Sequence, residues 1–189
     1  MSAQDSKLFV ISGPSGAGKG TLVTRVRERR SNLGLTVSAT TRAPRKGEVD
    51  GVNYFFLTRE EFDRRVANGE FVEWAEVHGN CYGTLVSEVQ SKLASGSSLI
   101  LEIDVQGALQ VKERFPEAVL IFIKPPSLEV LRERLVGRGT ETPDTIELRM
   151  ANAAHELALA DRYDDVVVND DLDRATDELV RVLDMHERI

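Results

Sequence analysis

A glycine-rich segment near the start of the chain, residues 9–21, constrains the fold more than any other part of the sequence. It begins as a short apolar run, continues as a turn and ends in a pattern typical of a helix start. Gly13, Gly18 and Lys19 have the spacing Gly-x4-Gly-Lys, which is that of a phosphate-binding loop. Glycines permit the backbone angles at which successive N–H groups surround an anion, and the next helix directs its positive end at the same anion. We therefore expect a strand, a loop that binds a triphosphate, and a helix.

The predicted loop departs from the common pattern at one position. Such loops usually continue from lysine to a serine or threonine whose hydroxyl binds Mg²⁺, whereas here Gly20 follows Lys19 and Thr21 comes one residue late. Phosphates, water and carboxylates remain as alternative ligands of the metal. A chance match is disfavoured because a strand precedes the loop and a helix follows it. The residues predicted to bind the triphosphate are Gly13, Pro14, Ser15, Gly16, Ala17, Gly18, Lys19, Gly20 and Thr21.

Strand-like and helix-like patterns alternate along most of the 189 residues. This alternation predicts a single α/β domain with a doubly wound, mostly parallel sheet. Residues 38–84 interrupt it with turn signals, β-rich pieces at 54–57 and 71–77, and a short helix after a capping box at 58–61. The expected core strands are residues 8–12, 35–37, 98–104, 118–123 and 166–168, and the expected helices are residues 21–30, 85–94, 106–115, 127–136, 143–163 and 171–187.

Charge and cysteine content exclude several classes of protein. The net charge of −7 argues against general affinity for nucleic acid or membrane surfaces, and the basic run at residues 25–30 is expected to be a solvated helix face. Cys81 is the only cysteine, which rules out an intrachain disulfide and suits a reducing compartment. The longest apolar run near the start, residues 8–11, is too short for a signal or membrane segment, so we expect a cytoplasmic protein. No oligomeric state follows from the sequence.

A second anion site is predicted directly after the second strand. Arg42 and Arg45 lie three residues apart around a proline, and arginine forks match phosphate oxygens in a bidentate way. The hydroxyl groups of Tyr54 and Tyr82 are further donors, and Glu73 is an acidic group in the same segment. Two arginines alone more often belong to a solvated surface. Their place at a strand end, in a chain with a phosphate loop, favours the binding site.

Several segments together resemble the guanylate kinase family along the whole chain. That resemblance implies transfer of the γ-phosphoryl group of ATP to GMP, with Mg²⁺ as the metal. It also implies a core of residues 1–37, 85–136 and 151–189, a GMP-binding insertion at 38–84 and a mobile lid at 137–150. The matching segments are residues 13–21, 37–45, 47–54, 70–74, 82–84, 101–107, 137–142 and 168–172.

The resemblance also assigns roles to individual residues. The Gly20 departure is similar to adenylate kinases, which are active, so it questions the metal ligands and not the activity. The implied catalytic cations are Lys19, Arg42, Arg45, Arg138 and Arg149. Arg138 and Arg149 are the lid arginines among them, and Asn169 is placed near the adenine. The implied GMP-binding residues are Ser38, Arg42, Arg45, Tyr54, Glu73, Tyr82, Thr84, Glu102 and Asp104.

A carboxylate can distinguish guanine from adenine by hydrogen bonding alone. Guanine offers two adjacent donors, N1–H and the N2 amino group, to Glu73, and the hydroxyls of Ser38 and Thr84 can donate to its O6. Adenine has an acceptor at N1, which would face the negative charge unpaired. Glu102 and Asp104 share one face at a strand end, where one could order metal-bound water and the other reach the guanine N2. Asp104 could instead cap the next helix.

Two other functions remain to be weighed against the kinase. A binding module of guanylate kinase type would keep the fold without catalysis, but such modules usually lose the phosphate loop that this chain has. A kinase for AMP or a sugar is disfavoured because Glu73 and Ser38 form a guanine-type pair. We therefore expect ATP and GMP as substrates.

Overall fold

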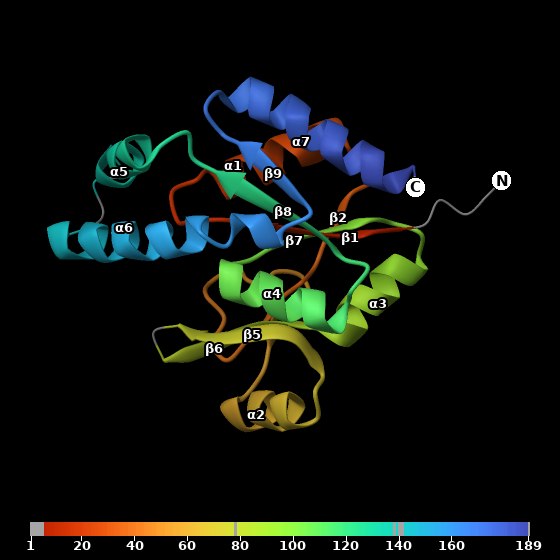
Figure 1. The fold of residues 1–189 in the computed structure, drawn as a ribbon. Coiled ribbons are helices and arrows are strands. Elements are labelled where there is room, and N and C mark those ends of the chain that lie inside the picture. Colours follow the sequence, from red (N-terminus) through yellow and green to blue (C-terminus); the bar gives the residue numbers. More distant parts are fainter. Residues whose placement is uncertain (1–5, 78, 138, 140–141, 189) are drawn as a thin grey trace.

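The computed structural model describes residues 6–77, 79–137, 139 and 142–188. Within these residues the larger sheet has five parallel strands in the order β2-β7-β1-β8-β9 (Figure 1). Strand β1 lies in the middle, with β7 and β2 on one side and β8 and β9 on the other, so the predicted doubly wound α/β sheet is confirmed. The strands are β1 Leu8–Ser12, β2 Gly34–Leu35, β7 Leu99–Glu102, β8 Val119–Lys124 and β9 Asp165–Val168.

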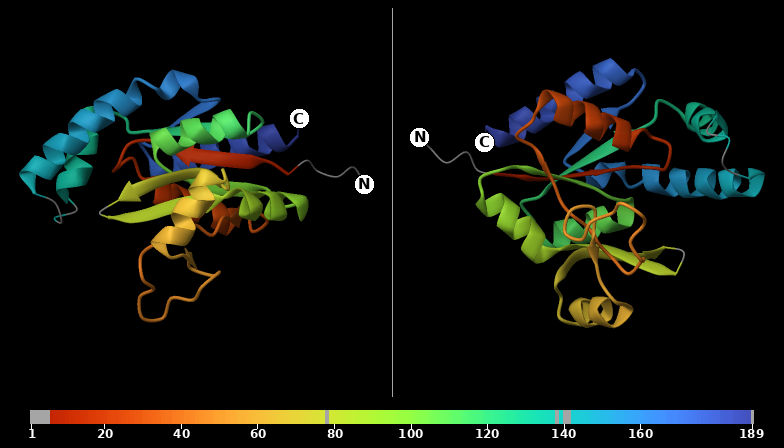
Figure 2. Two further views of the ribbon diagram at one scale, coloured as in Figure 1. Left: turned by 90° about the horizontal axis from the view of Figure 1, so that it is seen from below. Right: turned by 180° about the vertical axis from the view of Figure 1, so that it is seen from behind.

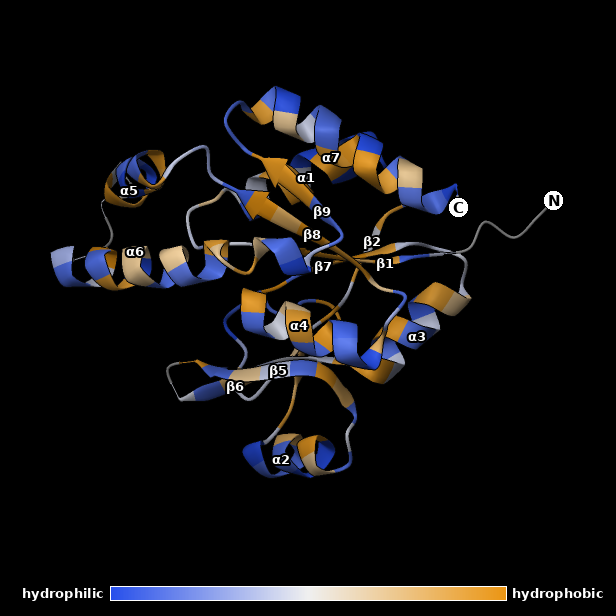
Figure 3. Ribbon diagram, viewed as in Figure 1, coloured by the Kyte–Doolittle hydropathy of each residue, from blue (hydrophilic) through white to orange (hydrophobic). Residues whose placement is uncertain are grey.

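Helices cover this sheet on both faces (Figures 1 and 2). Helices α1 (Lys19–Arg29) and α7 (Leu172–Glu187) lie on one face, and α3 (Val86–Ala94) and α4 (Val105–Arg114) lie on the other. Because both faces are buried, the central strands are nearly continuous apolar runs instead of alternating patterns. All five residues of β1 are buried, and apolar residues concentrate along the strands in Figure 3.

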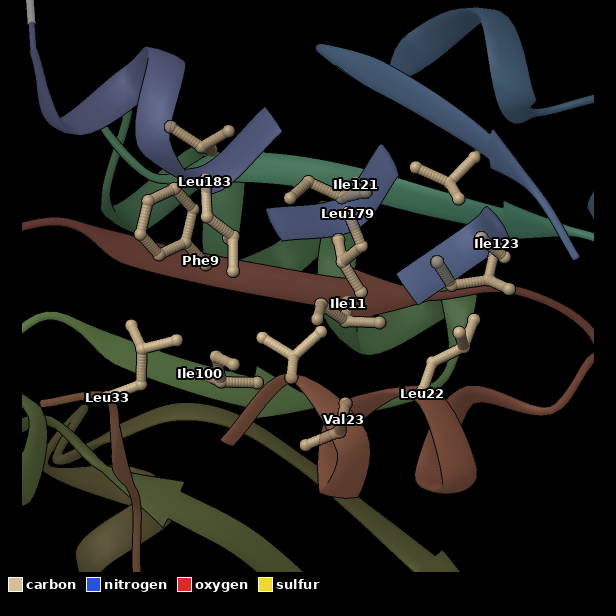
Figure 4. Close-up of a cluster of buried hydrophobic side chains, with 14 of the residues drawn as sticks. Phe9, Ile11, Leu22, Val23, Leu33, Ile100, Ile121, Ile123, Leu179 and Leu183 are labelled. Carbon is tan, nitrogen blue, oxygen red and sulfur yellow. The ribbon is translucent and has the colours of Figure 1, made fainter. Parts of the chain in front are cut away.

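Strand β1 supplies side chains to two separate cores. Phe9 and Ile11 pack towards α1 and α7 in the cluster drawn in Figure 4, whereas Leu8 and Val10 point to the opposite face and join the cluster under α4. All four side chains are buried. The strand that leads into the phosphate loop is thus anchored on both sides, and its carboxyl end is held in place.

The basic run at residues 25–30 lies mostly on a solvent-exposed helix face, as predicted, and several of its arginines also have acidic partners. Three of its arginines pair with carboxylates of α7, which lies beside α1 on the same face of the sheet. The exposed pairs of Arg25 and Arg29 each contribute little stability, about 0–1 kcal/mol. The Arg30–Glu187 pair is largely buried. These pairs do account for the run without nucleic acid. The pairs are Arg25–Asp173, Arg29–Asp177, Arg30–Asp184 and Arg30–Glu187.

The segment that interrupts the alternation forms a separate, mixed sheet. Its strands β4 (Phe55–Phe56), β3 (Ala39–Thr40), β6 (Asn80–Leu85) and β5 (Phe71–Val77) are hydrogen-bonded in that order. Helix α2 (Arg59–Ala67) packs on this sheet through Phe62, whose ring stacks on that of Phe71 with centroids 4.3 Å apart. Thr58 caps α2 by accepting from the Glu61 amide, as the capping box predicts.

The chain enters and leaves the smaller sheet at neighbouring points. Strands β3 and β6 are antiparallel, and Ala39 is paired with Gly83. Just before β3, the amide of Val37 donates to Glu88 of α3 over 2.9 Å. Lys92 of α3 donates to the Leu35 carbonyl over 2.6 Å. Helix α3 therefore holds the connection between the two sheets.

Helices α5 (Leu128–Gly137) and α6 (Pro143–Leu157) extend away from the larger sheet (Figure 1). Leu131 and Leu135 of α5 pack on Ala153 of α6. Thr142 caps α6 and Pro143 follows it, but α6 ends at Leu157 and not near residue 163, where the predicted helix ends. No described helix is long and apolar enough to cross a membrane.

A short 3-10 helix, η1 (Ala160–Arg162), follows the early end of α6. This turn places the ring of Tyr163 against Phe122, with centroids 5.0 Å apart, and leads directly into β9. Burial of this ring therefore competes with continuation of the helix.

Candidate active site

The phosphate loop connects β1 to α1 at the carboxyl edge of the larger sheet. Gly13 has φ 141° and Gly18, the N-cap of α1, has φ 90°, so both adopt backbone angles that favour glycine. A β-carbon on Gly18 would lie 2.4 Å from Nδ2 of Asn169. The loop therefore packs closely against the end of β9, and its glycines are required by the fold as well as by the predicted ligand.

Gly13→Ala is expected to lower the free energy of unfolding by about 2–5 kcal/mol. A β-carbon at Gly13 would lie 2.3 Å from the Ile123 carbonyl oxygen, which is backbone and cannot rotate away. Thermal unfolding of the purified variant measures the effect. Gly137→Ala is the control because a β-carbon there meets nothing within 4 Å. Equal unfolding temperatures for both variants would contradict the packing argument.

Two predicted catalytic cations contact the loop. Nζ of Lys19, the first residue of α1, donates to the carbonyls of Gly13 (2.6 Å) and Pro14 (3.0 Å). Nη1 of Arg149, on α6, donates to the Ser15 hydroxyl over 2.5 Å. The structure thus brings α6 to the phosphate loop over a separation of 134 residues. Arg138, the other predicted lid arginine, lies outside the described residues.

Asn169 holds the phosphate loop from the far side. It follows β9, is 6 % exposed, and donates through Nδ2 to the Ala17 carbonyl over 2.8 Å. Arg134 of α5 donates in turn to the Asn169 carbonyl over 2.7 Å. Sequence analysis singled out Asn169 but not Arg134, which stands in an ordinary amphipathic helix with no motif around it. The Asn169 side chain therefore orders the backbone of the phosphate loop, and its predicted place near the adenine is a separate role.

The smaller sheet brings together a cation and two tyrosines. The Arg42 guanidinium lies 5.4 Å from the ring centroid of Tyr54, and the Tyr54 and Tyr82 rings are 6.2 Å apart. Nη2 of Arg42 also pairs with Glu48 at 2.9 Å, a carboxylate that sequence analysis did not single out. The Arg45 side chain is exposed and makes no hydrogen bond or ion pair within the described residues. Arg42, Tyr54 and Tyr82 therefore form one cluster, with Arg45 at its rim.

Glu73, Thr84 and Asp104 converge at the amino end of α4. Oε1 of Glu73 accepts from the Thr84 hydroxyl over 2.8 Å. The β-carbon position of Gly107 is 3.5 Å from both Glu73 Oε2 and Asp104 Oδ1. Burial raises the pKa of Glu73; the Thr84 hydrogen bond opposes this rise, and nearby Asp104 adds to it. The hydroxyl proton of Thr84 is used by Glu73, so Thr84 orients the carboxylate and does not donate elsewhere in this conformation.

Asp104 is the N-cap of α4, as the helix-capping alternative supposed. Its Oδ1 accepts from the Gly107 amide over 2.7 Å. The predicted strand at 98–104 ends earlier, at Glu102, because the chain must turn into this cap. Oδ2 makes no hydrogen bond within the described residues, so the cap leaves one carboxylate oxygen for a ligand.

Two neighbouring cavities share lining residues beside the phosphate loop. One, of about 300 Å³, lies over the phosphate loop, and the other, of about 450 Å³, runs between α1 and the segment before β4. Gly20 and Glu102 line both cavities, whereas Ser38 and Tyr54 line the second. Ligands in the two cavities would therefore approach each other beside Glu102.

Glu102 is a carboxylate that lines both cavities. Burial raises its pKa, and the charge of Lys19 opposes the rise. A β-carbon at Gly20 would lie 3.5 Å from Glu102 Oε1, so the missing side chain leaves space next to the carboxylate. The described residues include no group of three or more histidine, cysteine or acidic side chains that could hold a metal. A metal here would need phosphate oxygens and water to complete its coordination, which suits Mg²⁺.

Comparison with known proteins agrees with this geometry. The family model for guanylate kinase matches residues 5–186. The chain belongs to the guanylate kinase family. A guanylate kinase of Gloeobacter violaceus is 56 % identical over 94 % of this chain and 87 % of the relative, and one of Halalkalibacterium halodurans is 51 % identical over 97 % and 90 %. The crystal structure of guanylate kinase from Anaplasma phagocytophilum has a TM-score of 0.73 and 36 % identity, covering 97 % of this chain and 87 % of that one.

Membership in this family explains why the chain has two sheets. The parallel sheet ends in the phosphate loop, and the mixed sheet carries the arginine–tyrosine cluster and Glu73. The full-length match to enzymes of this name favours a kinase over the non-catalytic binding module. The predicted family, fold and enzyme class are thus confirmed, whereas the roles of individual residues stay predictions.

Proposed function

We propose that this chain transfers the γ-phosphoryl group of ATP to GMP, giving ADP and GDP. An oxygen of the GMP phosphate attacks the γ-phosphorus, the bond from that phosphorus to the β–γ bridging oxygen breaks, and its electron pair leaves with ADP. The acceptor phosphate is already a nucleophile near neutral pH, so no general base is required. The observation that supports this proposal most strongly is that the phosphate-loop cavity and the cavity lined by Ser38 and Tyr54 share Gly20 and Glu102 as lining residues.

The donor half would bind ATP through the phosphate loop. Backbone amides of the loop would surround the phosphates, and Lys19 would move from the loop carbonyls to the terminal oxygens. Arg149, already at Ser15, would neutralise charge that develops on the transferred group. Residues 137–150 would act as a lid that carries Arg138 and Arg149.

The acceptor half would bind GMP through the smaller sheet, with residues 38–84 as its binding insertion. Arg42, Arg45, Tyr54 and Tyr82 would hold the phosphate. Glu73 would accept both guanine donors while Thr84 orients it, and Ser38 would donate to O6. A site built on such pairing rejects analogues that leave its polar groups unpaired, by about 10⁴–10⁵.

Mg²⁺, brought by ATP, would shield the charge between the β- and γ-phosphates. Glu102 is the residue best suited to hold Mg²⁺, through ordered water.

Replacing Glu102 by glutamine is expected to raise the Mg²⁺ concentration that gives the half-maximal rate about 10-fold, because residues that hydrogen-bond to metal ligands change metal affinity on this scale. A titration of rate against Mg²⁺ at saturating nucleotides measures it. Glu113→Gln, an exposed position on α4, is the control, and equal curves for both variants would contradict the role of Glu102.

Release of ADP with GMP, AMP, CMP or UMP as acceptor tests the proposed function directly. Rapid release with GMP and at least 10³-fold slower release with the other three is expected. Comparable release with AMP would indicate a different acceptor. No release with any acceptor, from folded protein that binds ATP, would contradict the catalytic proposal.

A further inference from the structure

Glu48 lies behind the arginine cluster of the smaller sheet and has no role in the activity derived so far. Its Oε1 accepts from Nη2 of Arg42 over 2.9 Å, and its Oε2 accepts from the backbone amide of Arg45 over 2.6 Å. One carboxylate therefore contacts both residues of the predicted phosphate cradle. The Arg42 and Glu48 side chains are 16 % and 19 % exposed, so this pair is more shielded from solvent than the other ion pairs of the smaller sheet.

Arg42 is restrained from several directions. Besides Glu48, its Nη1 donates to the Ala43 carbonyl over 2.7 Å. The guanidinium carbon lies 5.4 Å from the ring centroid of Tyr54 and 5.9 Å from that of Phe56. Two hydrogen bonds in the guanidinium plane and two rings beside it fix the direction of the remaining donors. The free N–H groups of this fork are thus oriented before any ligand arrives.

Glu48 also shapes the turn that carries Arg45. The Glu48 amide donates to the Arg45 carbonyl over 3.0 Å, while the Glu48 carboxylate accepts from the Arg45 amide. Gly47, between them, has φ 89° and permits this reversal. Loss of the carboxylate would leave the Arg45 amide without this acceptor and release the turn.

The electrostatics of the pair argue for orientation and not for attraction. A carboxylate beside Arg42 reduces the positive potential that draws a phosphate, so its presence weakens simple attraction. The Arg42 hydrogen bond lowers the pKa of Glu48, and the Arg45 amide lowers it further, so Glu48 stays ionised at neutral pH. A permanent negative charge in an anion site can raise affinity by holding a cation in place before the ligand binds.

We propose that Glu48 is a positioning residue for the phosphate group of the acceptor, acting through the Arg42 fork and the Arg45 turn. This inference rests on the proposed use of a nucleoside monophosphate as acceptor. Under this proposal, Glu48 contributes to the preference for a phosphorylated acceptor without contacting the phosphate itself. Preorganisation of this kind raises affinity because less side-chain freedom is lost on binding.

Glu48→Gln and Glu48→Ala test the proposal by a comparison of GMP with guanosine, which lacks the phosphate. For both variants we expect KM for GMP to rise about 10–100-fold, in line with the loss of partners that orient a ligand-binding group. KM for ATP and the dissociation constant of guanosine, measured by calorimetry, should stay within about two-fold. A structural defect would weaken guanosine and GMP alike, so this ratio separates positioning from folding.

Glu61→Gln is the matched control. Glu61 lies in the same segment and accepts from Arg64 and Arg65 on α2, so it makes the same charge change without contact to Arg42. Unchanged kinetics are expected for it. In a double-mutant cycle, Glu48→Gln should raise KM for GMP much less in an Arg42→Ala background than in the wild type, because Glu48 acts largely through Arg42.

Three outcomes would overturn the proposal. They are an unchanged KM for GMP in both Glu48 variants, an equal loss of guanosine and GMP binding, and full additivity with Arg42→Ala. Failure of the proposed function is distinguishable, because the wild type itself would then release no ADP with GMP. A wild type that uses GMP together with kinetically silent Glu48 variants would contradict this inference alone.

Discussion

Replacing Glu73 by glutamine is expected to lower kcat/KM for GMP by about 10²–10⁴ and to leave KM for ATP within about two-fold. Ionised Glu73 can accept two guanine donors, whereas glutamine offers one oxygen and turns an amino group towards the other donor. Two charge-assisted hydrogen bonds of about 1.5–3 kcal/mol each are weakened or lost in a half-buried site. Steady-state kinetics with each nucleotide varied in turn give both parameters. Unchanged values for GMP would remove Glu73 from base recognition.

The stability of the same variant supplies an internal control. Burial raises the folded-state pKa of Glu73 above the unfolded value, so ionisation costs more in the folded protein. The empty protein should therefore lose stability as pH rises through the interval between those two pKa values, and Glu73→Gln should remove this loss. Glutamine can still accept from Thr84. We expect the variant to unfold at or above the wild-type temperature at pH 7, which excludes misfolding as the cause of weak GMP use.

Replacing Arg149 by alanine is expected to lower kcat by about 10³–10⁵, with small changes in nucleotide affinity. This range is that of arginine residues that reach a transferring phosphoryl group from another element. The structure places the Arg149 guanidinium at Ser15 of the phosphate loop, the loop proposed to bind the triphosphate. Its effect would fall on the transition state, in which the equatorial oxygens need charge stabilisation. Single-turnover measurements at saturating ATP and GMP isolate this step.

Arg132→Ala is the appropriate control for that experiment. Arg132 lies on α5 and pairs with Glu147 of α6, the helix that also carries Arg149. About half of the Arg132 side chain is exposed. Loss of such an exposed pair should change stability by less than about 1 kcal/mol and kcat by less than about three-fold. If Arg149→Ala and Arg132→Ala lowered kcat by the same factor, the effect would come from the packing of α5 and α6, and Arg149 would have no direct part in transfer.

Local signals in the sequence were sufficient for the parallel sheet and the phosphate loop. Continuous apolar runs predicted β1 and β8 within a residue, and Thr58 caps its helix as expected, because a cap depends on residues three apart. The two-residue strand β3 carries no periodicity of its own. It forms because distant β6 pairs with it, which a local reading does not detect.

The parts of the site that sequence analysis missed arise from contacts across turns and helices. Glu48 stands in a turn rich in charge, and nothing in its spacing separates it from a solvated glutamate until the fold brings it to Arg42. Arg134 reaches Asn169 from another element in the same way. Thr84 was predicted as a donor to the base, but its proton is used by Glu73, a pairing fixed by the register of β5 with β6.

The adjacent entry and exit of the smaller sheet have an evolutionary consequence. Because β3 and β6 run side by side and the Val37 amide donates to Glu88, the intervening segment begins and ends at one seam, and α4 contacts it as well through Arg114, which donates to the Gly69 carbonyl. Recombination at that seam could replace this whole module in one event without disturbing the triphosphate cradle. New phosphotransferases could then acquire different acceptor specificities while they keep the same phosphate loop for phosphoryl transfer.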